Sequence, residues 1–188
     1  LAPEVRRRGD EPLIVSEFGN WGLPDVEALI AGYGGQEPWW FETGQEWGDG
    51  VVYPHAVQQR FSDFHFDRAF PTLSALAKAS QHMQHVALKY EIEQMRLHSS
   101  IQGYVITEFT DVHWECNGLL NMHREPKAFI EALPTIQADD VVVPNPERVV
   151  FWPGERCTIP VVVSHYSSLD LAQARLTWAL EGSPDLKG

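Results

Sequence analysis

The chain has 188 residues, of which 44% are hydrophobic and 21% charged, so it is long enough for one ordinary domain or for parts of two. This composition excludes disorder as the main state. Asp and Glu total 26 against 14 for Lys and Arg, and the formal net charge of -12 has the wrong sign for binding phosphate backbones or anionic lipid. We therefore expect neither nucleic acid nor a membrane as a partner.

The first predicted element is a strand at residues 13–15. The run Leu-Ile-Val is short, continuous and apolar, and it leads into Ser16, Glu17, Phe18 and Gly19. Continuous apolar runs of this length are typical of strands that are buried on both faces, as in parallel sheets. The pattern therefore predicts such a strand, with the carboxylate of Glu17 at its C-terminal end.

A long segment rich in Gly and Trp follows, from residue 20 to residue 70. Paired glycines and clustered aromatics break any regular period, and short helices are expected only near residues 25–31 and 54–66. Loops of this length are usually functional or disordered, and the aromatic content favours a functional loop. Sugar rings stack on aromatic faces, so Trp39 and Trp40 are candidate substrate contacts; the alternative is that the tryptophans form the loop's own small core.

A helix and a second strand are predicted next. Between residues 81 and 98, apolar side chains at helical spacing form two stripes, which predicts a helix covered on two sides. Residues 104–106, Tyr-Val-Ile, form another buried apolar run that ends at Thr-Glu-Phe-Thr-Asp, residues 107–111. Strand, helix and strand in this order predict a parallel pair. Pro126 is then expected to open a short helix over residues 127–133.

After residue 138 the pattern changes to short runs rich in valine and aromatic residues, separated by Pro, Gly and Ser. The runs that predict strands are residues 141–143, 148–152, 158–165 and 174–180. Strands at this spacing are typical of an antiparallel immunoglobulin-like sandwich, which needs about seven strands. Because the sequence supplies only about four, we expect an incomplete sandwich over residues 138–188.

Two of the predicted strands each deliver a carboxylate at the C-terminal end, Glu17 and Glu108. This edge of a parallel sheet is where α/β proteins build their sites. Glycoside hydrolysis uses two carboxylates, about 5 to 5.5 Å apart when the anomeric configuration is retained. The alternative is that either glutamate is a strand-end carboxylate paired with a neighbouring cation.

The residues around both carboxylates form longer motifs. Residues 12–19, Pro-Leu-Ile-Val-Ser-Glu-Phe-Gly, resemble the seventh barrel strand of glycoside hydrolase family 2, which contains β-galactosidases, β-glucuronidases and β-mannosidases. Residues 103–111, with Asn-Gly-Leu-Leu at 117–120 and Arg-Glu-Pro-Lys at 124–127, resemble the eighth strand, the loop after it and the start of the last barrel helix. The order and spacing of these parts make the resemblance, which covers residues 12 to about 135, more specific than either motif alone.

The resemblance implies an α/β fold, with residues 1–137 as the C-terminal portion of a (β/α)8 TIM barrel and residues 138–188 as the incomplete sandwich. It also implies that Glu17 is the nucleophile of a retaining β-glycoside hydrolase, which attacks the anomeric carbon and forms a glycosyl-enzyme ester. The family's acid/base glutamate lies in an Asn-Glu pair on the fourth barrel strand, which is expected upstream of this sequence. We therefore expect the N-terminal part of the same polypeptide as a partner, and no activity from this chain alone.

The pocket residues that the resemblance implies follow the second strand. Glu108, Asp111, Trp114 and Asn117 are candidate substrate contacts, and Trp114 is a candidate replacement for the tryptophan that family members commonly carry where this chain has Thr107. β-Glucuronidases carry an Asn-x-Lys motif that binds the uronate, where this chain has Glu-Cys-Asn at 115–117. The anionic residue favours a neutral hexoside as the carbohydrate substrate.

No cofactor and no metal ion is expected for this chemistry, and association into a homo-oligomer is left open. A rival hypothesis from another class is a noncatalytic carbohydrate-binding or structural protein on a degenerate glycosidase barrel. The threonine in place of the strand-eight tryptophan favours this rival, because a fold by itself does not carry a function.

Overall fold

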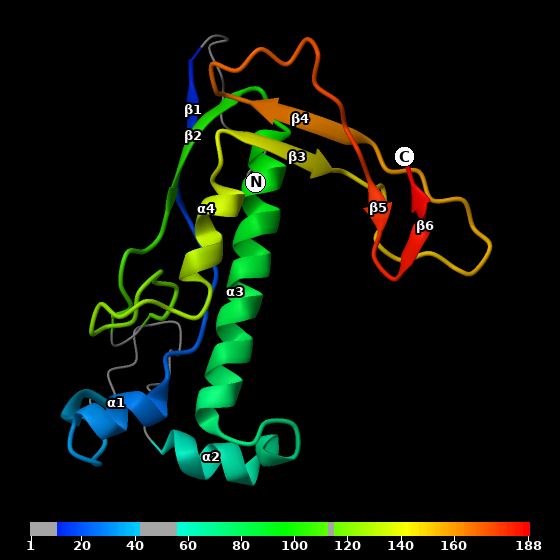
Figure 1. Ribbon diagram of the computed structural model, residues 1–188. Helices are drawn as coiled ribbons and strands as arrows, with labels where there is room; N and C mark the ends of the chain where they lie inside the picture. Colours follow the sequence, from blue (N-terminus) through cyan, green and yellow to red (C-terminus); the bar gives the residue numbers. More distant parts are fainter. Residues whose placement is uncertain (1–10, 42–55, 113–114) are drawn as a thin grey trace. The chain divides into compact units, whose positions relative to one another are not determined.

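The computed structural model describes residues 11–41, 56–112 and 115–188, with the helices and strands labelled in Figure 1. The chain divides into two compact units, residues 1–138 and residues 139–188. The first unit combines helices with a small parallel sheet, and the second contains antiparallel strand pairs. The architecture is therefore mixed α/β.

The first unit is built on two parallel strands, β1 (Leu13–Phe18) and β2 (Ile101–Ile106). Their pairing confirms the parallel pair expected from the strand, helix, strand order. Leu13 pairs with Ile101 at one end and Phe18 pairs with Ile106 at the other. The C-terminal ends of both strands therefore lie at the same edge of the sheet.

Helix α3 (Leu73–Arg96) supplies much of the core on which one face of this sheet packs. The buried members of that core are Leu88, Ile92, Met95, Ile101, Phe129 and Ile136. On the sheet's other face, Ile14 is 57% exposed and Val105 is 53% exposed. The prediction that both strands are buried on two faces is therefore wrong for the described residues, since their apolar cover lies on one face.

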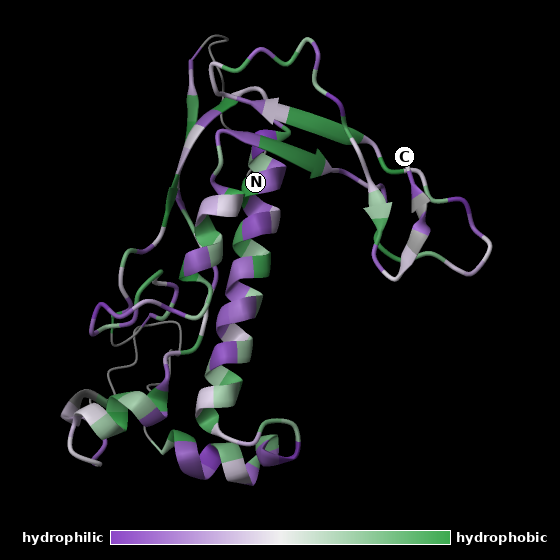
Figure 2. Ribbon diagram, in the orientation of Figure 1, coloured by the Kyte–Doolittle hydropathy of each residue, from purple (hydrophilic) through white to green (hydrophobic). Residues whose placement is uncertain are grey.

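Helix α3 begins after Thr72, whose hydroxyl caps the first turn by accepting a hydrogen bond from a backbone N–H. Hydrophilic and hydrophobic residues alternate along it in Figure 2. The stripe that contains Leu88 is buried, whereas Met83, Val86 and Tyr90 on the other stripe are 54–64% exposed. The expectation of a helix covered on two sides is wrong within the described part of the chain, because the second stripe has no apolar cover there.

Four short helical elements lie in the described parts of the segment between β1 and α3. They are α1 (Val26–Gly32), the 3-10 helix η1 (Trp39–Phe41), α2 (Val57–Asp63) and the 3-10 helix η2 (Phe66–Arg68). Asp25 caps α1 by accepting a hydrogen bond from the Ala28 N–H at 3.1 Å, in agreement with the helix predicted near residues 25–31. Val26 and Leu29 of α1 form a second small core with Phe41 of η1.

The end of the first unit differs from the prediction. Helical structure starts at η3 (Ile130–Ala132) and continues in α4 (Leu133–Ile136), so the helix expected to open at Pro126 is wrong. Pro126 instead forms an antiparallel bridge with Leu120, and the Lys127 N–H donates to the Leu119 carbonyl at 3.3 Å. These contacts with the preceding loop keep the two residues out of a helical turn.

The second unit contains two antiparallel pairs. Strand β3 (Asp140–Pro144) pairs with β4 (Val161–His165), and the short strand β5 (Ala179–Leu180) pairs with β6 (Ser183–Lys187). Much of β3 and β4 is hydrophobic in Figure 2. Because each sheet in the described residues has two strands, neither a closed barrel nor a sandwich is formed by them.

The predicted strand at residues 148–152 is absent from the described structure. Val149 is 87% exposed and Val150 is 74% exposed, so no partner strand covers them. Glu155 instead accepts hydrogen bonds from the Arg148 guanidinium and from the Trp152 N–H, each at 2.8 Å. A local polar turn therefore takes the place of strand pairing.

Candidate functional site

The carboxyl ends of β1 and β2 bring the two predicted strand-end glutamates to one edge of the sheet. Glu17 is the fifth residue of β1, and Glu108 follows the end of β2 by two residues. The Thr107 N–H donates to the Phe18 carbonyl at 2.7 Å, which ties the two strand ends together. A Cβ on Gly19 would lie 2.2 Å from the Thr107 carbonyl oxygen, so a side chain there would force the two segments apart.

Glu17 lies in an irregular part of the parallel pair. Val15 pairs with Tyr104 and Phe18 pairs with Ile106, so β1 has one more residue than β2 across this interval. Ser16 and Glu17 are both exposed, on a strand whose Val15 and Phe18 pack on the core. An extra residue of this kind re-aims side chains and is common beside active sites. The irregularity therefore presents the Glu17 carboxylate to solvent.

Glu108 is half-buried, and its buried Oε1 has no hydrogen-bond partner among the described residues. Burial raises the pKa of this carboxyl group, and the negative charges of Glu115 and Asp111 raise it further, whereas Lys127 opposes them. A raised pKa means that this carboxyl group retains its proton to a higher pH than an ordinary glutamate does.

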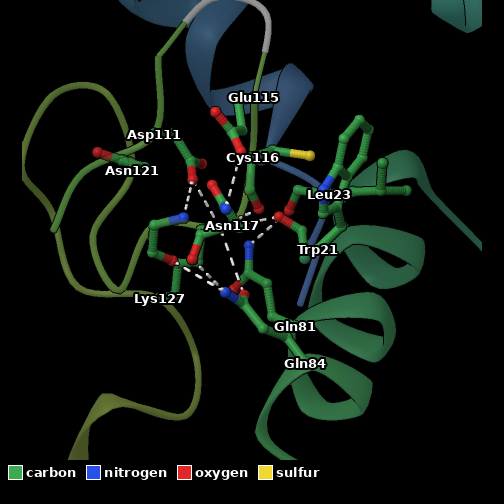
Figure 3. Close-up of polar contacts among 12 residues, drawn as sticks. Trp21, Leu23, Gln81, Gln84, Asp111, Glu115, Cys116, Asn117, Asn121 and Lys127 are labelled. Carbon is green, nitrogen blue, oxygen red and sulfur yellow. Dashed lines mark hydrogen bonds and ion pairs between the residues drawn. The ribbon is translucent and has the colours of Figure 1, made fainter. Parts of the chain in front are cut away.

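Asp111 and Lys127 form a buried ion pair beneath this edge (Figure 3). The Lys127 Nζ lies 2.8 Å from Asp111 Oδ1, and neither side chain is exposed. Asp111 Oδ1 also accepts a hydrogen bond from the Gly118 N–H at 2.9 Å, while its Oδ2 has no partner among the described residues. Burial raises the pKa of Asp111 to about 6 against the opposing effect of the Lys127 charge.

Lys127 also binds the two loops that leave the strands. Its Nζ donates to the carbonyl oxygens of Gly22, after β1, and of Cys116, after β2, at 2.9 and 2.8 Å. It lies 3.4 Å from Oε1 of Gln84 on α3, whose Nε2 donates to the Asn117 carbonyl at 2.8 Å. A single ammonium group therefore joins both strand-end loops and the helix behind them.

Asn117 and Cys116 also belong to this cluster, and the buried Oδ1 of Asn117 has no hydrogen-bond partner among the described residues. Asn117 is 6% exposed, and its Nδ2 donates to the Glu115 carboxylate at 2.9 Å. Burial raises the pKa of the Cys116 thiol to about 11, and the Asp111 charge raises it too. The thiol is thus neutral at physiological pH and a poor nucleophile.

The predicted aromatic contacts are more dispersed. Trp39 is 74% exposed on η1, the element that places the fully buried Phe41 in the small core of α1, and no described contact joins it to the Lys127 cluster. The backbone of Trp40 belongs to the same 3-10 helix, but its side chain lies outside the described residues, as does all of Trp114. The structure thus gathers Glu108, Asp111 and Asn117 and leaves Trp39 on a separate element.

Sequence reasoning missed Lys127, Gln81 and Gln84 as parts of this region. The two glutamines are 6% and 0% exposed and continue the buried stripe of α3 toward its N-terminus. Polar residues in an otherwise apolar stripe are the signal that could have located them, because buried polar groups require partners. The signal for Lys127 is weaker, since only its partners explain its burial.

Neither a metal centre nor a membrane span is found in the described part of the chain. The described residues hold no group of three or more His, Cys, Asp or Glu side chains arranged to bind a metal ion. Within the same residues, every helix is too short or too polar to cross a bilayer.

Comparison with known proteins gives a partial structural likeness. No protein-family model matches the chain, and no curated protein matches it. Among solved structures, the chain is similar to a β-D-mannosidase from Dictyoglomus thermophilum, with a TM-score of 0.46 and 19% sequence identity. The match covers 71% of this chain, which spans only 17% of that enzyme chain.

Proposed function

We propose that this chain carries the nucleophile of a retaining β-glycoside hydrolase that acts on the O-glycosidic bonds of a neutral sugar. Glu17 is the nucleophile, and the acid/base glutamate belongs to an upstream barrel strand of the same polypeptide. The parallel pairing of β1 with β2 carries this proposal, because it brings Glu17 and Glu108 to one sheet edge within motifs that resemble glycoside hydrolase family 2.

The exposure of Glu17 suits nucleophilic attack. A carboxylate on a solvent-facing strand end can approach the anomeric carbon, and the leaving oxygen takes its proton from the upstream acid. A covalent glycosyl ester forms on Glu17, and water then cleaves it with the upstream residue acting as the base. Glu108, Asp111 and Asn117 serve as pocket residues in this scheme, together with Trp39, Trp40 and Trp114.

A neutral sugar fits the local charge. Glu108, Asp111 and Glu115 contribute three carboxyl groups around one buried ammonium, that of Lys127. One N–H of the Asn117 side-chain amide donates to the Glu115 carboxylate, so Asn117 stands beside a negative charge rather than a cation that could bind a uronate. A negatively charged sugar would meet repulsion from these carboxylates.

The decisive experiment replaces Glu17 in the protein that joins this chain to the upstream strands the proposal requires. Glu17→Gly is expected to lower kcat on a neutral nitrophenyl β-glycoside by about 10³-fold or more. This loss corresponds to a rise of about 4 kcal/mol in the activation free energy. Added azide fits the vacated space and attacks the anomeric carbon, so it restores turnover and gives the α-glycosyl azide. Glu131→Gln, an exposed glutamate on η3, is the matched control and keeps the wild-type rate.

Covalent trapping provides the complementary readout. A fluorinated neutral glycoside is expected to label Glu17, as detected by peptide mass spectrometry, and a label on another residue would show that the nucleophile is misassigned. Unchanged turnover in Glu17→Gly would reject the catalytic role. A protein that binds neutral glycosides but hydrolyses none would instead match the noncatalytic sugar-binding scaffold.

A further inference from the structure

The loop directly after β1 carries an exposed aromatic residue that the sequence analysis did not assign. Trp21 lies four residues beyond Glu17 and is 54% exposed. Single exposed apolar side chains are common on protein surfaces, so exposure by itself identifies nothing. What distinguishes Trp21 is the way in which the backbone around it is held.

Hydrogen bonds from separate parts of the first unit hold the two residues that follow Trp21. The Gly22 N–H donates to the Cys116 carbonyl at 2.9 Å, and the Gly22 carbonyl accepts from the Lys127 ammonium at 2.9 Å. On the other side of Gly22, the Leu23 N–H donates to Ser80 Oγ at 3.1 Å. Figure 3 shows Trp21 and Leu23 together with Cys116 and Lys127.

Two further contacts complete the anchoring. The Leu23 carbonyl accepts from Gln81 Nε2 at 2.8 Å, and the Trp21 N–H donates to Asn20 Oδ1 at 2.9 Å. Both backbone polar groups of Gly22 and of Leu23 are therefore satisfied by groups distant in the sequence. A loop held this firmly has lost its conformational freedom before any ligand arrives, which lowers the entropic cost of binding.

The packing of Gly22 shows that the anchoring depends on close approach. A Cβ at this position would lie 2.2 Å from Gln84 Oε1 and 3.1 Å from the Gln81 Cα. The loop backbone thus packs directly on α3, while the side chains of Trp21 and, to a smaller extent, Leu23 remain exposed. The fold has fixed the backbone and left the indole ring to solvent.

We infer that Trp21 is a preorganised stacking platform for a neutral pyranose ring at the Glu17 site. This inference rests on the proposed function, which supplies the sugar. The flat indole face packs against the C–H face of a sugar ring, and an aromatic contact of this kind needs no charge. The buried ion pair of Asp111 and Lys127 contributes by holding the Gly22 carbonyl, so Lys127 acts as a positioning residue for Trp21.

The test measures the binding of a neutral thioglycoside, which resists hydrolysis, to the protein that hydrolyses the matching O-glycoside. Trp21→Ala is expected to raise Kd about 5- to 10-fold, and Trp21→Phe to retain most of the affinity because a ring remains. Trp152→Ala removes a 76% exposed tryptophan from residues 139–188 and is the matched control, with Kd unchanged. Ser80→Ala, which removes one anchoring bond and keeps the ring, is expected to weaken binding by a smaller factor.

The outcomes separate this inference from the proposed function. An unchanged Kd in Trp21→Ala, in a protein that hydrolyses the O-glycoside through Glu17, would overturn the Trp21 platform and leave the nucleophile in place. A wild-type protein that neither binds nor hydrolyses any neutral glycoside would overturn both. A raised Kd in Trp21→Ala with an unchanged melting temperature supports the platform, because a merely structural tryptophan would change stability instead.

Discussion

Asp111 and Asp140 are central carboxylates in polar clusters of the two units, yet their pKa values move in opposite directions. Asp111 is fully buried, has one oxygen without a partner among the described residues, and has its pKa raised by burial to about 6. Asp140 is partly exposed, and hydrogen bonds from Ser167 lower its pKa, with the His165 and Tyr166 contacts acting in the same direction. In the first unit, burial raises the pKa of Asp111 more than its ion pair lowers it. In the second unit, hydrogen bonds lower the pKa of Asp140 more than weak desolvation raises it.

The Asp140 cluster also shows why residue types alone do not identify a site. Asp140, His165 and Ser167 are the residue types of a hydrolase triad. Ser167 Oγ, however, donates to Asp140 Oδ2 at 2.6 Å, and His165 Nδ1 lies 2.6 Å from the other carboxylate oxygen. The carboxylate stands between the serine and the histidine, so the histidine is not arranged to activate the serine. The cluster fixes the turn after β4.

The largest expected effect comes from breaking the buried ion pair of the first unit. Lys127→Met leaves the Asp111 carboxylate buried without its cation, and we expect the free energy of unfolding to fall by about 3–5 kcal/mol. Lys89→Met is the control, because Lys89 pairs with Glu93 on the surface of α3 and such exposed pairs contribute about 0.5 kcal/mol or less. Urea titration of both variants measures the difference. Equal losses of unfolding free energy in the two variants would mean that the buried Lys127 pair contributes no more to stability than the exposed Lys89 pair.

The opposite pKa shifts predict opposite pH dependences in the two units. The folded pKa of Asp111, about 6, lies above its unfolded value of about 3.9, so the folded state retains a proton that the unfolded state has released. The stability of residues 1–138 is therefore expected to fall by roughly 3 kcal/mol as pH rises from about 4 to about 7. Asp140 has a lowered pKa, so its contribution is complete above about pH 4 and is lost as pH falls below that value.

Urea titrations at several pH values, followed through the amide signals of α3 and of β3 and β4, separate the two units. Asp111→Asn is the control, and it is expected to flatten the decline in the α3 signals. A rise in the stability of the first unit over pH 4–7 that disappears in Asp111→Asn would mean that the pKa of Asp111 is lowered, not raised.

A smaller effect tests the packing of the loop after β1. Gly22→Ala places a methyl group against Gln84 and Gln81, and the two glutamines are themselves tied by hydrogen bonds, so we expect a loss of about 1–3 kcal/mol. Gly32→Ala is the matched control, because a Cβ there meets nothing within 4 Å. Thermal unfolding of both variants gives the comparison. A loss in Gly22→Ala no larger than in Gly32→Ala would contradict the close approach of this loop to α3.

Local sequence patterns determined much of the first unit. Apolar runs at residues 13–15 and 104–106 predicted the parallel pair, and the strand, helix, strand order put Glu17 and Glu108 at one edge. A short helix was expected near residues 25–31, where α1 lies, and the helical spacing after residue 81 predicted part of α3. These features depend on neighbours within a few residues along the chain, which is why they can be read from the sequence.

Contacts between distant segments were decided only by the tertiary structure. Lys127 follows a proline that predicted a helix start, yet its ammonium binds Asp111 and the carbonyl of Gly22, 105 residues away in the chain. The exposure of residues 148–152 and the hydrogen bonds that hold the backbone after Trp21 likewise depend on which segments meet in space. Side-chain pairing and desolvation depend on contacts between segments that are distant in the chain. The sequence therefore determined where the strands end, and the fold determined the pairing and the pKa shifts of the side chains at that edge.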